Sequence, residues 1–314
     1  MAVLHAPVEL VAARAQKTLP RADARRPVRF EPKYDGWRGL LFTSDGVLQS
    51  RRGTNLATRF PELIAAARTF GDVVLDGEIV ALRDGRLDFG ALTSAPRGRA
   101  AAGITIYFIA FDLLAEGHHD LRETTCRDRR ARLEAVMAGA RPPLQLAPCT
   151  TDLDQALTWM QPEVSAVGIE GCVIKQLDQP YRPGRNGDWI KVRHTVVVDA
   201  VVIGATGNLS SPAELLLARP DSTGELRRIG LSQPLSPALR AEAGPHLDIT
   251  GEPPARVSTG QFGSRGETEY KPVHPTLVVE VEAEGSVHAF TNRLRPTVYR
   301  LRPDVDVADL QPDH

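Results

Sequence analysis

Short runs of apolar residues separated by turn residues dominate the first two thirds of the chain and predict a domain with many strands. The segment 73–82 alternates around Gly77, which predicts a bulged strand or a pair of strands. The segment 104–114 is apolar almost throughout, so we expect a strand that is buried on both faces. The turn pair Asp35-Gly36 separates two apolar runs and predicts a hairpin over 28–43. Further strands are expected at 46–50, 168–177 and 188–193.

Helices are expected in fewer places. Pro61 favours a helix over 60–70, because proline suits the first turn of a helix. The segment 127–137 predicts a helix whose arginines, at positions 127, 129, 130 and 132, form a solvated face. The remaining helices are expected at 9–15, which is rich in alanine, and at 153–160 and 237–243.

From residue 196 onward the pattern changes to short strand-like segments with one helix between them. Five short strands with a single interposed helix suit a small barrel of the oligonucleotide-binding (OB) kind. We therefore expect a boundary near 194–198 and two domains, 1–195 and 196–314, each long enough for its own core. The strands are expected at 196–205, 213–218, 226–231, 276–283 and 297–301.

Composition and charge exclude several classes of protein. The formal net charge is −1, so binding to nucleic acid would have to come from a local basic face. No apolar run is long enough to span a bilayer, and the N-terminus lacks a signal-peptide pattern. The cysteines, Cys126, Cys149 and Cys172, are odd in number and show no metal-binding spacing, which fits a reducing compartment. We therefore expect a cytoplasmic protein without membrane contacts.

Lysine is rare in this chain, since it makes up only five of the 38 basic residues. A general bias toward arginine explains the ratio. In such a chain a retained lysine indicates a chemical need, because arginine can neither lose its proton nor act as a compact charge. Three of the five, Lys33, Lys175 and Lys191, fall inside the motifs described next.

The stretch Glu31-Pro32-Lys33-Tyr34-Asp35-Gly36-Trp37-Arg38 places one lysine between two acids and an arginine. A lysine that acts as a nucleophile must lose its proton, and the usual lysine pKa of about 10.4 opposes that loss at neutral pH. Nearby cations and partial burial favour the neutral amine. Taken alone, the stretch favours an exposed lysine on a hairpin turn.

The pattern Lys-x-Asp-Gly-x-Arg resembles the active-site signature of covalent nucleotidyltransferases, which include ATP-dependent DNA ligases, RNA ligases and mRNA capping enzymes. In these families the lysine attacks the α-phosphate of a nucleotide and holds it as a lysyl-NMP. Further segments that resemble DNA ligase motifs follow in order along the chain. They are Ser50-Arg51-Arg52-Gly53, Asp76-Gly77-Glu78, Phe111-Asp112, Glu170 to Lys175 and Asp188 to Arg193.

For the nucleotide, the resemblance implies contacts from several of these residues. Arg51 would contact a phosphate, Glu78 would accept hydrogen bonds from ribose hydroxyls, and Glu31 would lie near the adenine amino group. Arg38, the fixed arginine of the signature, belongs to the same set. Phe111 would stack on the purine, although an aromatic residue in an apolar strand equally suits the core.

For the metal and the phosphates, Glu170 offers a carboxylate suited to Mg²⁺, a hard cation that prefers oxygen ligands. The resemblance implies two Mg²⁺ ions, for which Mn²⁺ can substitute. Lys191 and Arg193 lie two apart on a strand and so share a face, which suits the neutralisation of phosphates. Strict alternation places Lys175 and Glu170 on opposite faces, so a role for Lys175 at the phosphates requires a bulge or twist. With Lys33 as nucleophile, Glu170 and Lys191 complete the expected catalytic set.

The final motif departs from the family pattern. DNA ligases often end in Arg-x-Asp-Lys, a barrel segment that closes over ATP and orients the leaving pyrophosphate. Here the segment reads Arg302-Pro303-Asp304-Val305, so Arg302 and Asp304 are expected to act on the substrate while the lysine is missing. That loss is expected to weaken self-adenylation. Arginines that lie close by in the sequence and could substitute for the lysine are Arg293, Arg295 and Arg300.

The resemblance covers residues 30 to 305 and implies an α+β protein, with a nucleotidyltransferase (adenylation) domain followed by an OB β-barrel domain. The implied activity is that of a compact bacterial ATP-dependent DNA ligase that seals nicked duplex DNA in repair, as a monomer, through lysyl-AMP. A polymerase or an end-binding repair protein is an expected partner. Alternatives are an RNA ligase, a capping-type enzyme, or a non-catalytic protein that binds nucleic-acid ends. Contacts with DNA phosphates are expected from arginines 51, 97, 99, 182 and 185.

Overall fold

Two units divide the chain, one from Met1 to Arg193 and one from His194 to His314, and each is described by itself. The computed structural model describes residues 3–20, 23, 25–161, 163–164, 167–184, 188–258, 266–284 and 295–310. The division lies close to the expected boundary, and the expected bounds of 1–195 and 196–314 stay predictions. In the described part of the chain, no helix has the length and apolar character needed to cross a membrane.

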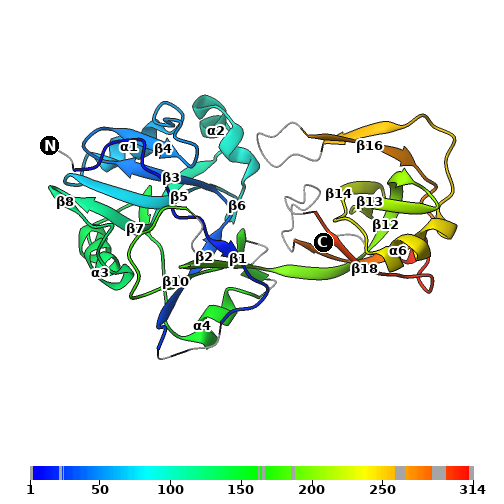
Figure 1. Cartoon of the computed structure of the whole chain (residues 1–314). Coiled ribbons are helices and arrows are strands. Elements are labelled where there is room, and N and C mark those ends of the chain that lie inside the picture. The colour runs from blue at the N-terminus through cyan, green and yellow to red at the C-terminus, as the bar shows by residue number, and fades with distance from the viewer. Residues whose placement is uncertain are drawn as a thin grey trace. The chain divides into compact units, whose positions relative to one another are not determined.

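A large sheet, here called the central sheet, occupies the first unit (Figure 1). In spatial order its strands are β4 (Val47–Ser50), β3 (Trp37–Phe42), β5 (Val73–Arg83), β7 (Thr105–Glu116) and β8 (His119–Asp120), with β6 (Arg86–Leu87) beside β5 and β9 (Leu144–Leu146) beside β7. One face packs on α1 (Pro61–Ala67) and α3 (Cys126–Met137) through an apolar core that includes Leu41, Leu75 and Phe108. The 3-10 helix η1 (Gly90–Thr93) and the α-helix α2 (Pro96–Ala101) follow β6 along the chain.

One expectation for the central sheet is confirmed. The segment 73–82 forms one bulged strand, because the register between β5 and β7 shifts between Val74 and Leu75 and again between Asp76 and Gly77. The second shift sets Asp76 opposite Asp112 and brings Gly77 opposite Ala110. The bulge therefore turns residues near position 111 of β7 toward the face of the sheet that does not carry the helices.

A smaller sheet, here called the site sheet, lies beside it and consists of β1 (Arg14–Ala15), β11 (Trp189–Arg193), β10 (Ile169–Gln176) and β2 (Val28–Tyr34), in that order. β10 is antiparallel to both β2 and β11, whereas β1 runs parallel to β11. Its apolar face packs on α4 (Leu153–Thr158) through Phe30, Cys172 and Val192. The opposite face carries polar residues, which is the alternation expected of a half-buried sheet.

The predicted hairpin over 28–43 is wrong. β2 pairs with β10, and β3 pairs with β4 and β5, so the two strands belong to different sheets. The chain crosses from one sheet to the other at Asp35-Gly36, where a Cβ on Gly36 would lie 2.4 Å from the carbonyl oxygen of Ile79. Only glycine allows this close approach to β5. A local turn signal predicts the reversal but not the sheet that each strand joins.

Two further expectations in the first unit are wrong. The segment 9–15 is not a helix but ends in β1, because Leu10 and Val11 are buried in an apolar cluster and hold the chain extended beside β11. In α3 the side chains of Arg129 and Arg130 are 0% and 8% exposed, so the arginines do not form one solvated face. Arg129 is neutralised inside the protein by Asp112, as described below.

In its described residues the second unit is a curled sheet with one α-helix, as expected for the barrel (Figure 1). Its spatial order is β14 (Leu226–Leu231), β13 (Ser211–Pro220), β12 (Thr195–Asn208), β16 (Glu267–Pro272) and β15 (Ala255–Ser258), with β17 (Val278–Glu284) pairing with β12 and β18 (Thr297–Leu301). Ser236 caps α6 (Pro237–Ala243), and the turns η2 (Gly244–His246) and η4 (Val307–Asp309) complete the unit. The sequence did not predict β15 and β16, because both strands contain few apolar residues. Their sequences are Ala-Arg-Val-Ser and Glu-Thr-Glu-Tyr-Lys-Pro. The α+β fold class is confirmed.

Candidate active site

The site sheet carries six of the twelve residues that the sequence singled out. Val173 of β10 lies opposite Glu31 of β2 on one side and opposite Lys191 of β11 on the other. Residues two apart along a strand share a face, so Lys33 lies beside Glu31 and Arg193 beside Lys191. The apolar residues between them pack into the cluster on the opposite face. The predicted shared face of Lys191 and Arg193 is therefore present.

Lys33 and Glu170 meet on this face. The ammonium of Lys33 donates a hydrogen bond to Oε2 of Glu170, and the two side chains are 17% and 10% exposed. Nε of Arg193 lies 3.7 Å from the same carboxylate oxygen. A nucleophile candidate, a carboxylate and a second cation therefore share one partly buried position.

A bulge brings Glu170 onto the face of the site sheet that carries Lys175. The register between β2 and β10 shifts between Ile169 and Cys172, and Gly171 has a φ of +138°. Because of this shift, Glu170 contacts Lys33 while Lys175 contacts Glu31, two residues earlier on β2. Strict alternation, which would put Glu170 and Lys175 on opposite faces, fails at this point for a local backbone reason.

Lys175 is completely buried, and its partners differ from the phosphates that the motif suggested. Its Nζ lies 2.8 Å from Oε2 of Glu31 and donates to the carbonyl oxygen of Phe111 at 3.1 Å. It also lies 4.3 Å from the centroid of the Phe111 ring and 4.0 Å from that of Trp189. Burial lowers the pKa of Lys175, and the carboxylate of Glu31 opposes that shift. Lys175 thus holds the strand that carries Phe111.

Glu31 is also buried, and both of its carboxylate oxygens face cationic side chains of the protein. Its side chain is 3% exposed, one oxygen lies 2.7 Å from Nε of Arg29, and the other faces Lys175. Arg29 in turn donates to the carbonyl oxygen of Phe111 at 3.0 Å. Glu31, Lys175 and Arg29 therefore form a buried charged group beside the backbone carbonyl of Phe111. Direct contact between Glu31 and adenine stays a prediction.

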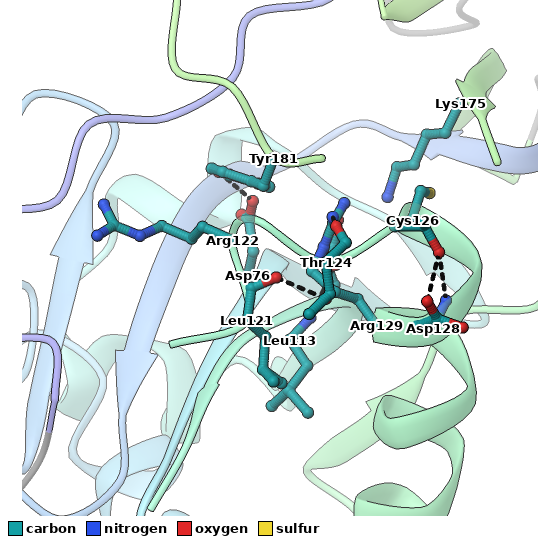
Figure 2. Close-up of polar contacts among 12 residues, drawn as sticks. Asp76, Leu113, Leu121, Arg122, Thr124, Cys126, Asp128, Arg129, Lys175 and Tyr181 are labelled. Atoms are coloured by element: carbon teal, nitrogen blue, oxygen red, sulfur yellow. Dashed lines mark hydrogen bonds and ion pairs between the residues drawn. The ribbon is translucent and has the colours of Figure 1, made fainter. Parts of the chain in front are cut away.

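Arg38 is held by a bidentate ion pair. Its Nε and Nη2 lie 3.0 Å and 2.7 Å from the two oxygens of Asp76, which is fully buried. The hydroxyl of Tyr181 donates to Asp76 at 2.8 Å (Figure 2). It also accepts a hydrogen bond from Arg38 at 3.2 Å. Burial and Asp76 raise the pKa of Tyr181 well above its usual value, so the hydroxyl keeps the proton that it donates. The sequence motifs did not reveal Tyr181, because it lies in an irregular segment before β11.

Glu78 lies directly opposite Arg38 in the ladder between β3 and β5. Burial raises the pKa of the Glu78 carboxyl to about 8, although Lys33 and Arg38 act to lower it. At neutral pH such a carboxyl is mostly protonated, so it can donate a hydrogen bond as well as accept one. This property suits contact with a ribose hydroxyl, which is also both donor and acceptor.

Phe111 is partly buried and turns toward the same region. Its ring lies edge-on to Trp189 with centroids 5.9 Å apart, and Cζ of Arg38 lies 5.6 Å from its centroid. Both functions that the sequence allowed are thus compatible with its position, since a partly exposed ring that packs on one side can stack on a base with the other.

A second buried ion pair supports the strand that carries Phe111. Asp112 and Arg129 are both fully buried, and Nε and Nη2 of Arg129 donate to the two carboxylate oxygens at 2.8 Å and 3.1 Å. Burial opposes ionisation of Asp112, but Arg129 and Lys175 outweigh it and keep the pKa of Asp112 below its usual value. Figure 2 shows Arg129 at the start of α3, beside the segment that contains Thr124, whose carbonyl oxygen accepts a further hydrogen bond at 2.7 Å.

The other predicted residues are Arg51 in the first unit and Arg302 and Asp304 in the second. Arg51 is exposed in the turn after β4, where the Ser50 hydroxyl accepts from the backbone NH of Arg52 at 3.3 Å and of Thr54 at 3.0 Å. Arg302 and Asp304 belong to the second unit and pair with each other there. Of the suggested substitutes for the missing lysine, Arg295 pairs with Glu214 and Arg300 with Glu280, while Arg293 lies outside the described residues.

A metal ion is compatible with Glu170. Within the described residues, no three His, Cys, Asp or Glu side chains cluster closely enough to hold a metal without further ligands. The carboxylate of Glu170 already attracts two cationic side chains, Lys33 and Arg193, which shows that it is a favourable position for positive charge. Oxygen donors of this kind suit Mg²⁺, which commonly binds through one or two carboxylates plus substrate phosphates.

The chain is similar to known DNA ligases over most of its length. A family described as "ATP dependent DNA ligase domain" matches residues 11–193. DNA ligase C2 of Mycolicibacterium smegmatis is 34% identical over 317 residues, which cover 88% of this chain and 86% of that protein. The multifunctional non-homologous end joining protein LigD of Mycobacterium bovis is 34% identical over 88% of this chain, but only 36% of that protein is covered. The solved ligase domain of LigD from M. tuberculosis has a TM-score of 0.53 and 27% identity, covering 96% of this chain and 97% of that one.

Proposed function

Because this chain belongs to the family of ATP-dependent DNA ligases, we propose that Lys33 is the residue that receives AMP when the enzyme seals a nick. The reaction of such an enzyme joins a 5′-phosphate to a 3′-hydroxyl and uses ATP. Membership of this family sets aside the alternatives of an RNA ligase, a capping-type enzyme and a non-catalytic end-binding protein. The roles assigned below to individual residues are proposals.

The observation that carries the assignment is the meeting of Lys33, Glu170 and Arg193 on one face of the site sheet. Attack on the α-phosphate forms a bond from Nζ of Lys33 to phosphorus and breaks the bond from phosphorus to the pyrophosphate oxygen. Before that step, Nζ must lose a proton and leave Glu170. Arg193 competes with Lys33 for the same oxygen of Glu170, so the ion pair can be replaced without leaving the carboxylate unpaired.

The remaining residues bind and orient. Lys191 shares the face of Arg193, which supports a proposed role in neutralising phosphate charge. We propose that Glu78 contacts the ribose and that Phe111, whose carbonyl oxygen accepts hydrogen bonds from Arg29 and Lys175, stacks on the base. Mg²⁺ would be held by Glu170, and it would supply positive charge to the phosphate under attack.

A nick-sealing panel tests this function. Purified protein should seal a nicked DNA duplex with ATP and should do so poorly with GTP, or when the strands that flank the nick are both RNA. Equal or better sealing of an all-RNA nick would contradict the assignment to DNA. Sealing with GTP as efficient as with ATP would contradict the nucleotide assignment.

Glu170→Gln tests the proposed metal contact. The change keeps the size of the side chain and removes its charge, so we expect self-adenylation to fall by roughly 10²–10³-fold, as for other oriented transition-state contacts. The Mg²⁺ concentration needed for half-maximal rate should also rise. Glu163→Gln, which alters an exposed acid a few residues away, is the matched control and should behave like the unaltered protein. An unchanged Mg²⁺ requirement in Glu170→Gln would remove Glu170 from the metal site.

Contact with DNA is proposed for the exposed arginines among those that the sequence suggested. Arg51, Arg97 and Arg182 are exposed, and Arg185 lies outside the described residues. Arg99 is excluded, which corrects the expectation. Its side chain is 2% exposed, lies 3.0 Å from Glu62, and donates to the carbonyl oxygens of Ser94 and Arg59 at 2.8 Å and 2.7 Å. It holds α2 against α1 instead.

Arg97→Ala should therefore affect DNA binding, whereas Arg99→Ala should affect the stability of the fold. Arg97→Ala removes one proposed phosphate contact. It should therefore weaken the binding of nicked DNA and reduce the slope of log affinity against log salt by about one. Arg99→Ala should keep that slope but lower the free energy of unfolding by about 1–3 kcal/mol, because buried carbonyl groups lose their donor. Fluorescence anisotropy over a salt series and urea unfolding measure the two effects. A reduced salt slope in Arg99→Ala would overturn the distinction.

A role in end repair with a polymerase or an end-binding partner is supported by the likeness to a protein named for non-homologous end joining. Stimulation of sealing at double-strand ends by such a partner, and not at simple nicks, would test it; no stimulation would count against it. The expected monomeric state and cytoplasmic location also stay predictions, and sedimentation analysis tests the first.

A further inference from the structure

The segment 8–16, here called the N-terminal strap, connects the central sheet with the site sheet. Its start is fixed to β4 by Gln49, which is 2% exposed. The side-chain amide of Gln49 accepts from the NH of Val8 at 2.8 Å and donates to the carbonyl oxygen of Val8 at 2.7 Å. The end of the strap forms β1, which pairs with β11, and the NH of Gln16 donates to the carbonyl oxygen of Lys191 at 3.0 Å. The strap is therefore bonded to a strand of each sheet.

The middle of the strap is buried at Val11, which is 1% exposed. Its carbonyl oxygen accepts a hydrogen bond from Nη1 of Arg38, and its NH donates to the hydroxyl of Tyr181 at 3.4 Å. Two backbone hydrogen bonds with Gly184, one on either side of Val11, hold the same turn of chain at 3.1 Å and 2.7 Å. The side chain of Val11 belongs to an apolar cluster with residues of β3 and β11. Val11 is thus held from both sheets.

The strap links two candidate site residues that lie on different sheets. Val11 and Gln16 are five residues apart, and they contact Arg38 on β3 and Lys191 on β11. Arg38 is also held by its bidentate ion pair with Asp76, so it does not depend on the strap alone. β11, in contrast, has β10 along one edge and the strap along the other. A loosened strap should therefore displace β11 more than β3.

We propose that the N-terminal strap is a positioning element that holds β11, and with it the side chain of Lys191, in a fixed place relative to the central sheet. Val11 and Gln49 are its positioning residues, and neither belongs to a motif described above. The anchor at Val8 precedes the residues that match the ligase family, which begin at residue 11. The inference rests on the proposed function for the role of Lys191. Its physical reason is that a group displaced by about 1 Å from a reacting centre can lose most of its effect.

Hydrogen exchange tests the placement of β11 without any nucleotide. Val11→Ala shortens a buried side chain and leaves the backbone bonds of the strap possible. Because local opening of the strap frees one edge of β11, amides of 189–193 should exchange about 10-fold faster in this variant. Amides of β5, which pairs with β3 and β7, should keep their exchange rates within about twofold.

Self-adenylation tests the consequence for the reaction. At saturating ATP, the rate for each active molecule of Val11→Ala should fall by about 10-fold. The ATP concentration for half-maximal rate should change by less than about twofold, because the residues proposed for base and ribose, Phe111 and Glu78, lie on the central sheet. A purely structural effect would lower the amount of active protein instead. Gln49→Met, which keeps the size of the side chain and removes both bonds to Val8, should give a smaller loss of the same kind.

Val3→Ala is the matched control. It makes the same chemical change just before the strap, at a side chain that is 40% exposed, and should leave exchange and activity unchanged. Lys191→Ala should slow self-adenylation by roughly 10²–10³-fold. In that background Val11→Ala should add less than about twofold, because its effect passes through Lys191.

Four outcomes would overturn the inference. They are unchanged exchange over 189–193 in Val11→Ala, an unchanged rate for each active molecule, a rise in the ATP requirement as large as the loss of rate, and additive losses in the double variant with Lys191→Ala. The exchange measurement needs no activity, so it decides the placement of β11 even if the unaltered protein is not labelled by ATP. Labelling of Lys33 in the unaltered protein is measured separately and decides the proposed function.

Discussion

Lys33→Arg is expected to abolish the covalent complex with AMP. The guanidinium keeps its positive charge and can still pair with Glu170, but it stays protonated and cannot attack phosphorus. Incubation with α-labelled ATP followed by denaturing electrophoresis should therefore show no label above background. Because Lys33 is the proposed nucleophile of self-adenylation, the expected loss of label is complete.

The control for this prediction is Lys17→Arg. Lys17 is exposed and lies outside every motif, so the same chemical change there should leave labelling intact. Circular dichroism of both variants would show that the fold is kept. Undiminished labelling in Lys33→Arg would place the nucleophile elsewhere in the chain.

Arg129→Ala is expected to have the largest effect on stability. Removing the arginine leaves Asp112 fully buried without its ion-pair partner, and breaking a buried pair in this way costs about 3–5 kcal/mol of unfolding free energy. Urea unfolding measures that loss. The nucleotide site should suffer too, since Asp112 follows Phe111 on β7.

Arg132→Ala on the same helix is the matched control. Arg132 pairs with Glu116 at 3.2 Å, but the side chains are 49% and 42% exposed. Exposed pairs of this kind contribute about 0–1 kcal/mol, so this variant should unfold almost like the unaltered protein. Replacing both partners, in Asp112→Asn with Arg129→Gln, should recover part of the stability because no charge is then left unpaired. Equal losses in Arg129→Ala and Arg132→Ala would contradict the burial argument.

Local patterns predicted much of the fold and of the site. Alternation along a strand depends only on neighbouring residues, which is why the shared face of Lys191 and Arg193 followed from the sequence. The helix over 127–137 and the bulged strand over 73–82 were predicted for the same reason. The hairpin was not, since Asp35-Gly36 signals a turn but carries no information about the partner strand.

The features that escaped prediction depend on partners distant in the sequence. The helical pattern predicted that Arg129 would be exposed to solvent. Its burial depends on an ion pair with Asp112, which lies on another element. Tyr181 contacts both Arg38 and Asp76, although it lies more than 100 residues after them in the sequence. The bulge at Gly171, which decides the face of Glu170, was left open by the sequence, because a glycine in a strand permits a bulge without requiring it.

A single-turnover chase tests the central claim most directly. Protein labelled with α-labelled ATP and then freed of nucleotide is mixed with excess nicked DNA and Mg²⁺. If Lys33 carries AMP to the nick, the label should leave the protein, appear briefly on the DNA 5′-phosphate, and be released as AMP at the rate at which sealed strands appear. Sealed strands that form while the label stays on the protein would contradict the claim.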